Sequence, residues 1–174
     1  MKLLTIIALC FLSSYGHSKG QTKKAPVLAP FSTDGCSRFP NGLGQGEWLN
    51  CCELHDIAYW AGVGEASAKE VADHDLHLCL KEQDRDFLSW LIPFGVRAAE
   101  GINFTSLVKT PFRWGYGWNV VLGKKQAPPN HLEIIQSQIH TVIPGIQSYR
   151  LKNKYPPLTE EQIEKVRKVL TSYF

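Results

Sequence analysis

Two adjacent cysteines, Cys51 and Cys52, stand one helical turn before a histidine–aspartate pair, His55 and Asp56, and Tyr59 follows one turn later. Adjacent cysteines cannot easily bond to each other, so in an oxidised protein each must reach a different part of the chain. Two further segments are therefore fixed around the most reactive side chains of the sequence. Such bracing suits an active site better than a core.

The beginning of the chain predicts an export signal. Lys2 precedes an apolar run at 3–12 that is too short to span a bilayer, and small residues follow around Gly16. We expect residues 1–16 to be a signal peptide, residues 17–30 a flexible lead-in, and the protein to be secreted or periplasmic. Cys10 leaves with the signal, so an even number of the 5 cysteines remains, which favours two disulfides in an exported chain.

The rest of the chain, 31–174, has the length of a single domain. The net charge of +3 permits attraction to anionic lipid, and we expect no nucleic-acid partner and no transmembrane segment. Glycines and Pro40 predict a structured loop over residues 31–46, called here the glycine-rich loop. Apolar periodicity and capping boxes at 67–70 and 159–162 predict helices over about 47–61, 67–83, 86–96, 132–142 and 159–173. Strand signals are few, so we expect a mainly α fold.

The first predicted helix presents its reactive residues on one face. Each helical residue advances about 100° around the axis. Measured from Cys51, His55 lies at about 40°, Tyr59 at about 80°, Cys52 at about 100° and Asp56 at about 140°. His55 is therefore above the Cys51 edge of this face, and Asp56 is above the Cys52 edge.

The short turn at 62–64 predicts that the first two helices are antiparallel. If Cys51 bonds to Cys79, the two helices are joined at that level. Asp73 then lies about 9 Å from the joined level, between His55 at about 6 Å and Tyr59 at about 12 Å. At that height Asp73 could accept hydrogen bonds from both side chains.

Two disulfide pairings are open on these grounds. With Cys51–Cys79 formed, Cys52 bonds to Cys36 and draws the glycine-rich loop toward Asp56. The alternative pairing, Cys36–Cys51 with Cys52–Cys79, would exchange these neighbours.

The two carboxylates suggest different chemical roles. A carboxylate that bonds one imidazole nitrogen leaves the other nitrogen as a general base, which would be the role of Asp73 toward His55. Asp56 faces a loop with many backbone carbonyls, and oxygen ligands of this kind suit calcium. Since no serine or cysteine nucleophile is indicated nearby, the expected nucleophile is water.

At these residues the chain resembles the secreted phospholipase A2 family. The active-site helix of that family carries Cys-Cys-x-x-His-Asp-x-x-Tyr, which is present here from Cys51 to Tyr59. Its following helix carries Asp-x5-Cys, present here from Asp73 to Cys79, and the spacing of Cys36 from Cys52 matches a family disulfide. The resemblance covers about residues 34–80. The region beyond about residue 85 would be a C-terminal extension of a single phospholipase A2-like domain.

The resemblance implies calcium-dependent hydrolysis of the sn-2 ester of glycerophospholipids at a membrane or micelle surface. It implies the disulfides Cys36–Cys52 and Cys51–Cys79. These would brace two antiparallel helices that are preceded by a calcium loop. It also implies that water is activated by His55, that Asp73 orients His55, and that Tyr59 supports Asp73. Calcium would be bound by Asp56 and by loop carbonyls.

The glycine-rich loop departs from the family pattern. The family loop has Cys-Gly-x-Gly-Gly, whereas this chain has Cys36-Ser37-Arg38-Phe39-Pro40. Alignment from Cys36 makes the carbonyls of Gly35, Ser37 and Phe39 the candidate calcium ligands. The unusual loop and the small number of cysteines point to a divergent, bacterial form.

Several alternatives accompany this interpretation. The chain could be a non-catalytic lipid- or protein-binding relative, although binding alone needs none of the residues of the predicted site. His74 and His77, with Asp75, could suggest zinc, but no third ligand is implied and a solvated helix face is favoured. The aromatic cluster Trp114, Tyr116 and Trp118 could dock on lipid or pack inside the protein.

Overall fold

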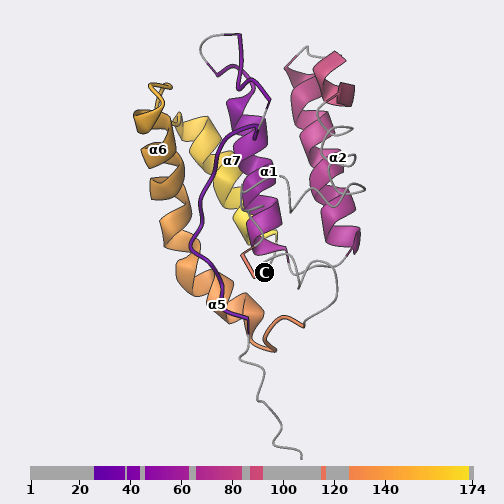
Figure 1. The fold of residues 1–174 in the computed structure, drawn as a ribbon, viewed down its shortest axis with the longest axis vertical. Helices are drawn as coiled ribbons and strands as arrows, with labels where there is room; N and C mark the ends of the chain where they lie inside the picture. The colour runs from indigo at the N-terminus through magenta and orange to yellow at the C-terminus, as the bar shows by residue number, and fades with distance from the viewer. Residues whose placement is uncertain are drawn as a thin grey trace, which may run out of the picture.

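The structure is a computed structural model that describes residues 26–37, 39–43, 46–62, 66–83, 87–91, 115–116 and 126–172, with side chains from 69 onward in the second helix. Helices dominate these residues and no strand occurs among them, which confirms the mainly α prediction. Figure 1 shows α1 between α2 and α7, with α5 and α6 along one side.

The two helices that carry the predicted site are α1, Leu49–Ala61, and α2, Ala66–Glu82. A disulfide from Cys51 to Cys79 joins the beginning of α1 to the end of α2, so the helices run antiparallel. α1 begins slightly later than predicted because Gly46 has a φ of 75° and Trp48 is a non-helical N-cap residue. The capping box predicted at 67–70 depends on the side chain of residue 67, which lies outside the described part of the structure.

The C-terminal half of the described chain forms α5, His131–Gln138, the 3-10 turn η2, Ile139–Thr141, and α6, Val142–Lys152, followed by α7, Glu160–Thr171. The capping box at α7 is confirmed: Thr159 accepts from the Gln162 amide, and the Gln162 side chain accepts from the Thr159 amide. The predicted helix over 132–142 continues much further, through α6. Pro144 is compatible with this because it lies in the first turn of α6, where its missing N–H has no helical acceptor.

The site helices and the C-terminal helices share one apolar core. Its centre is formed by Ile57 and Trp60 of α1 with residues of α5, α6 and α7, namely Ile135, Val142, Ile146, Val166 and Leu170. Leu28 and Phe31 are also buried there, and the Trp60 indole donates to the Ala29 carbonyl at 2.8 Å. Leu28 of the expected lead-in is therefore packed in the core, since burial of its apolar side chain gains free energy, whereas Val27 beside it is 74% exposed.

Several predictions fall wholly or partly outside the described residues. They are the signal peptide at 1–16, the lead-in up to residue 25, most of the helix at 86–96, and the aromatic positions 114 and 118. Residues 87–91 are described and are helical. Along the described stretches, no helix is both long enough and apolar enough to cross a membrane.

Docking of Tyr116 on lipid is contradicted by the structure. The side chain is 6% exposed and belongs to the main core. Two backbone hydrogen bonds hold this segment inside: the Gly115 amide donates to the Trp60 carbonyl at 3.2 Å, and the Ala29 amide donates to the Gly115 carbonyl at 2.6 Å. Tyr116 thus packs inside the protein, the second of the two alternatives.

Candidate active site

His55 and Tyr59 of α1 both bond to one oxygen of Asp73 on α2. Nε2 of His55 lies 2.9 Å from Oδ1 of Asp73, and the Tyr59 hydroxyl donates to the same oxygen at 2.7 Å. The two rings lie one turn apart on the same helix face, with their centroids 4.2 Å from each other. The structure therefore brings together the three residues that the sequence proposed as a unit.

Asp73 is buried, and its surroundings favour the ionised carboxylate. Burial is the largest influence on its pKa and raises it, but hydrogen bonds from His55 and Tyr59 act in the opposite direction. The positive charges of His55, when protonated, and of Lys69 add to these bonds, so the pKa of Asp73 lies below its usual 3.8. Because an ionised Asp73 accepts from Nε2 of His55, that nitrogen carries the proton and Nδ1 is the basic one.

Both disulfides have the pairing that the family resemblance implied. Cys36–Cys52 has its Cα atoms 5.0 Å apart, and Cys51–Cys79 has them 5.6 Å apart. The first ties the glycine-rich loop to α1, and the second ties α1 to α2 close to His55. The sulfur atoms form a second apolar cluster with Trp48, Leu76 and Leu80.

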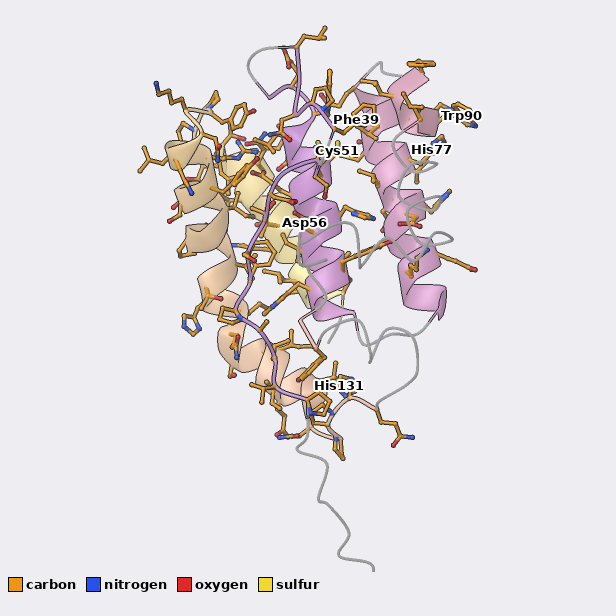
Figure 2. The ribbon with its side chains drawn as sticks, viewed as in Figure 1. Phe39, Cys51, Asp56, His77, Trp90 and His131 are labelled. Carbon is orange, nitrogen blue, oxygen red and sulfur yellow. A yellow bond between two sulfur atoms is a disulfide. The ribbon has the colours of Figure 1, made fainter. Side chains whose placement is uncertain are left out.

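Asp56 lies on the edge of α1 that faces the first residues of the glycine-rich loop. Figure 2 labels it midway along α1, with Cys51 nearer the beginning of the helix and Phe39 beyond. The Thr33 hydroxyl donates to Oδ2 of Asp56 at 2.6 Å, and the Gly35 amide donates to the Thr33 hydroxyl at 3.0 Å. Asp56 is buried, with 8% of the residue exposed, and the Thr33 hydroxyl links its carboxylate to the glycine-rich loop.

The glycine-rich loop turns sharply at two of the candidate ligand positions. Gly35 has a φ of 73° and Ser37 a φ of 54°, and the Phe39 amide donates to the Cys36 carbonyl at 3.0 Å. Within the described part of the chain, the carbonyls of Gly35, Ser37 and Phe39 accept no hydrogen bond. A buried carboxylate and backbone carbonyls are hard oxygen groups, the kind of ligand that calcium takes.

A cavity of about 410 Å³ opens between α1, α2 and the end of α7, and His55 lines it. Most of the other lining groups are apolar or small, namely Leu54, Ala58, Val71, Ala72, Leu76 and Val169. Asp75 and Ser172 add polar groups to the wall. A base in the wall of an apolar cavity can act on a ligand that places a long hydrocarbon chain there.

Three features of the site escaped the sequence analysis. Lys69 places its ammonium 3.3 Å from Oδ2 of Asp73, and its position one turn before Asp73 on a helix was an available signal. Thr33 bonds to Asp56 across a loop, which no local pattern indicates. Glu53 of α1 is fully buried against Arg150 of α6, far away in the sequence.

The zinc alternative finds no support in the described residues. His77 bonds through Nδ1 to the Ser89 carbonyl at 2.7 Å, and its ring stacks on His74 with centroids 6.4 Å apart. In the described ranges, no group of three or more His, Cys, Asp or Glu side chains is arranged to hold a metal ion. The calcium site that the sequence predicts at Asp56 would be of a different kind, because most of its expected ligands are backbone oxygens.

Comparison with protein-family models, with curated proteins and with solved structures finds no match to this chain. The motif residues and their geometry are therefore the basis for a proposed function.

Proposed function

We propose that this protein is a secreted, calcium-dependent lipid hydrolase of the phospholipase A2 type, a divergent member of that family. The observation that carries the proposal is the shared oxygen of Asp73, which lies 2.9 Å from His55 Nε2 and 2.7 Å from the Tyr59 hydroxyl. His55 also lines an apolar cavity. An aspartate with a purely structural role would not require its histidine partner to lie there. A general base needs both the orienting carboxylate and access to a ligand.

In the proposed reaction, His55 Nδ1 takes a proton from water as the water oxygen attacks the sn-2 carbonyl carbon. Asp73 keeps Nε2 protonated and stabilises the imidazolium that forms. Tyr59 holds the Asp73 carboxylate in place. His55 then returns the proton to the leaving alkoxide as the ester C–O bond breaks, which yields a fatty acid and a lysophospholipid.

The other groups of the site have supporting roles in this proposal. The apolar cavity beside His55 would hold an acyl chain of the substrate. Calcium, when bound by Asp56 and the carbonyls of Gly35, Ser37 and Phe39, would supply a positive charge for the phosphate and the ester carbonyl oxygen. Thr33 supports the proposed ion site by holding the Asp56 carboxylate at the loop.

The test is fatty-acid release from mixed phospholipid vesicles, with calcium and with a chelator, by the wild-type chain and by His55→Gln. A matched control is His140→Gln, because His140 is an exposed histidine of η2. We expect calcium-dependent release by the wild type and the control, and a loss of about 10²–10⁴-fold in His55→Gln. Full release in chelator, or an active His55→Gln protein, would contradict the mechanism. Vesicle binding without any release would favour the non-catalytic lipid-binding alternative.

A further inference from the structure

Tyr149, near the end of α6, reaches across to the glycine-rich loop. Its hydroxyl donates to the Asp34 carbonyl at 2.8 Å and accepts from the Asn41 amide nitrogen at 3.0 Å. The Asn41 oxygen in turn accepts from the Cys36 amide at 2.8 Å. One side chain from the C-terminal region and one from the loop thus bond the backbone on both sides of Gly35.

These bonds determine the direction of the Gly35 carbonyl. In a trans peptide the C=O and N–H groups point in opposite directions, and the described residues contain no cis peptide. Because the Cys36 N–H points at Asn41, the Gly35 carbonyl of the same peptide unit points away from Asn41. The preceding peptide unit is fixed at both ends, by Tyr149 at the Asp34 carbonyl and by Thr33 at the Gly35 amide.

The loop carbonyls therefore form two alternating sets. Those of Asp34 and Cys36 accept hydrogen bonds from the protein, from Tyr149 and from the Phe39 amide. Those of Gly35, Ser37 and Phe39 accept none from the described residues, and these are the candidate ligands.

Close packing holds the arrangement. A Cβ placed on Gly35 would meet the Asn41 side-chain oxygen and would lie 2.7 Å from the Tyr149 hydroxyl. The Asn41 nitrogen also donates to the Tyr155 hydroxyl at 3.1 Å, and the rings of Tyr149 and Tyr155 stack with centroids 6.4 Å apart. Tyr149, Tyr155 and Asn41 thus connect α6 and the segment after it to the glycine-rich loop through hydrogen bonds and ring stacking.

We propose that Tyr149 and Asn41 are positioning residues that pre-form the calcium-binding backbone of the loop. This inference rests on the proposed function and assigns a role to the C-terminal helices, which the family resemblance does not cover. The reason is physical: a site with one carboxylate and neutral carbonyls gains little from charge, so its affinity depends on rigidity. The hydrogen bonds from α6 supply that rigidity to the loop.

The test is calorimetric titration of the full chain with calcium chloride, comparing the wild type with Tyr149→Phe and Asn41→Ala. Tyr116→Phe is the matched control. It removes the hydroxyl of a buried tyrosine whose partner among the described residues, the His131 carbonyl at 3.5 Å, lies outside the loop. We expect Tyr149→Phe to weaken calcium binding by about threefold to tenfold and Tyr116→Phe to leave it unchanged. Fatty-acid release by Tyr149→Phe should return to the wild-type rate at saturating calcium, because His55 and Asp73 are untouched.

The thermal midpoint without calcium separates positioning from general stability. If Tyr149→Phe lowers the midpoint no more than Tyr116→Phe does, yet weakens calcium binding, the positioning role is supported. Unchanged calcium affinity in both Tyr149→Phe and Asn41→Ala would overturn the inference while leaving the proposed function intact. A wild-type chain that binds no calcium would instead overturn the calcium site of the proposed function, and this inference with it.

Discussion

Arg150 of α6 forms a bidentate ion pair with Glu53 of α1, with Nη2 2.6 Å from Oε2 and Nε 2.9 Å from Oε1. Glu53 is fully buried one residue after Cys52, and Arg150 also donates to the Pro156 carbonyl at 3.1 Å. Burial raises the pKa of Glu53, and the hydrogen bonds and charge of Arg150 oppose that rise. The helix that carries His55 is thus attached to the C-terminal helices by a charged contact on its far side.

We predict that Arg150→Met lowers the free energy of unfolding by about 3–5 kcal/mol at neutral pH, because it leaves a buried carboxylate without its cation. The loss should depend on pH. When the pKa of a carboxyl group is raised in the folded state, its contribution to the free energy of unfolding is fully present below the unfolded-state pKa of 4.5. That contribution is lost as the pH rises through the folded-state pKa. Without Arg150 the pKa of Glu53 rises further, so the defect should shrink as the pH falls toward 4.5.

Urea unfolding at several pH values measures this effect. Arg167→Met is the control, because Arg167 is exposed on α7 and its contact with Glu164 is 3.6 Å long. We expect the control to change stability by no more than about 0.5 kcal/mol. An equal loss for both variants, or a loss at position 150 that does not vary with pH, would contradict the account of Glu53.

The two disulfides should be separable by function. Each should stabilise the fold by about 3–4 kcal/mol in the chain-entropy model, since they close segments with separations of 16 and 28 residues. Replacing Cys51 and Cys79 by alanine should reduce turnover, because it loosens α2 and Asp73 from His55. Replacing Cys36 and Cys52 should weaken calcium binding, because it frees the glycine-rich loop. Calorimetry and fatty-acid release on both double variants test this, and identical defects would argue against the division.

Much of the site was predictable because its spacing is local. Helical periodicity alone places His55 and Tyr59 on one face, and a single inter-helix disulfide then sets the height of Asp73. The resemblance chose between the two cysteine pairings, which helix geometry left open. The capping box of α7 was predictable for the same reason, since Thr159 and Gln162 are close in the sequence.

The contacts that were missed join residues far apart in the sequence. Nothing near Glu53 indicates a partner on α6, and the Tyr149–Asp34 bond likewise depends on how α6 packs against the loop. The burial of Tyr116 was ambiguous because an aromatic residue between glycines suits either a lipid surface or a core. Tyr116 is buried in the same core cluster as Leu28 and Trp60, and sequence periodicity cannot indicate such long-range packing.

We predict that Tyr59→Phe separates stability from calcium binding. Loss of a hydrogen bond to a charged group should lower the free energy of unfolding by about 1.5–3 kcal/mol at neutral pH. Asp73 has a lowered pKa in the folded state, so the stability that its partners supply is present above 3.8 and is lost as the pH falls. The difference from the wild type should therefore shrink in acid, whereas calcium affinity should stay unchanged. Urea unfolding between neutral and acid pH, with calcium calorimetry alongside, tests both statements.

We predict that Asp56→Asn and His55→Gln fail in different ways. Asp56 is the one carboxylate of the proposed calcium site, so wild-type affinity should be weak, in the range of about 10⁻⁴–10⁻³ M. Asp56→Asn keeps the side-chain shape but removes the charge, so calcium binding and turnover should be lost together. His55→Gln removes the base and leaves the ion ligands, so calcium should still bind while turnover falls by about 10²–10⁴-fold.

Asp73→Asn completes the comparison, because the imidazole keeps a neighbour but loses its orienting charge. Its turnover should lie between those of the wild type and His55→Gln, with calcium affinity unchanged. Calcium titration by calorimetry beside fatty-acid release on these three variants distinguishes the base, its orienting carboxylate and the ion ligand. If Asp56→Asn retained calcium binding, the ion would have to lie elsewhere, and if His55→Gln lost it, the separation of base from ion site would be wrong.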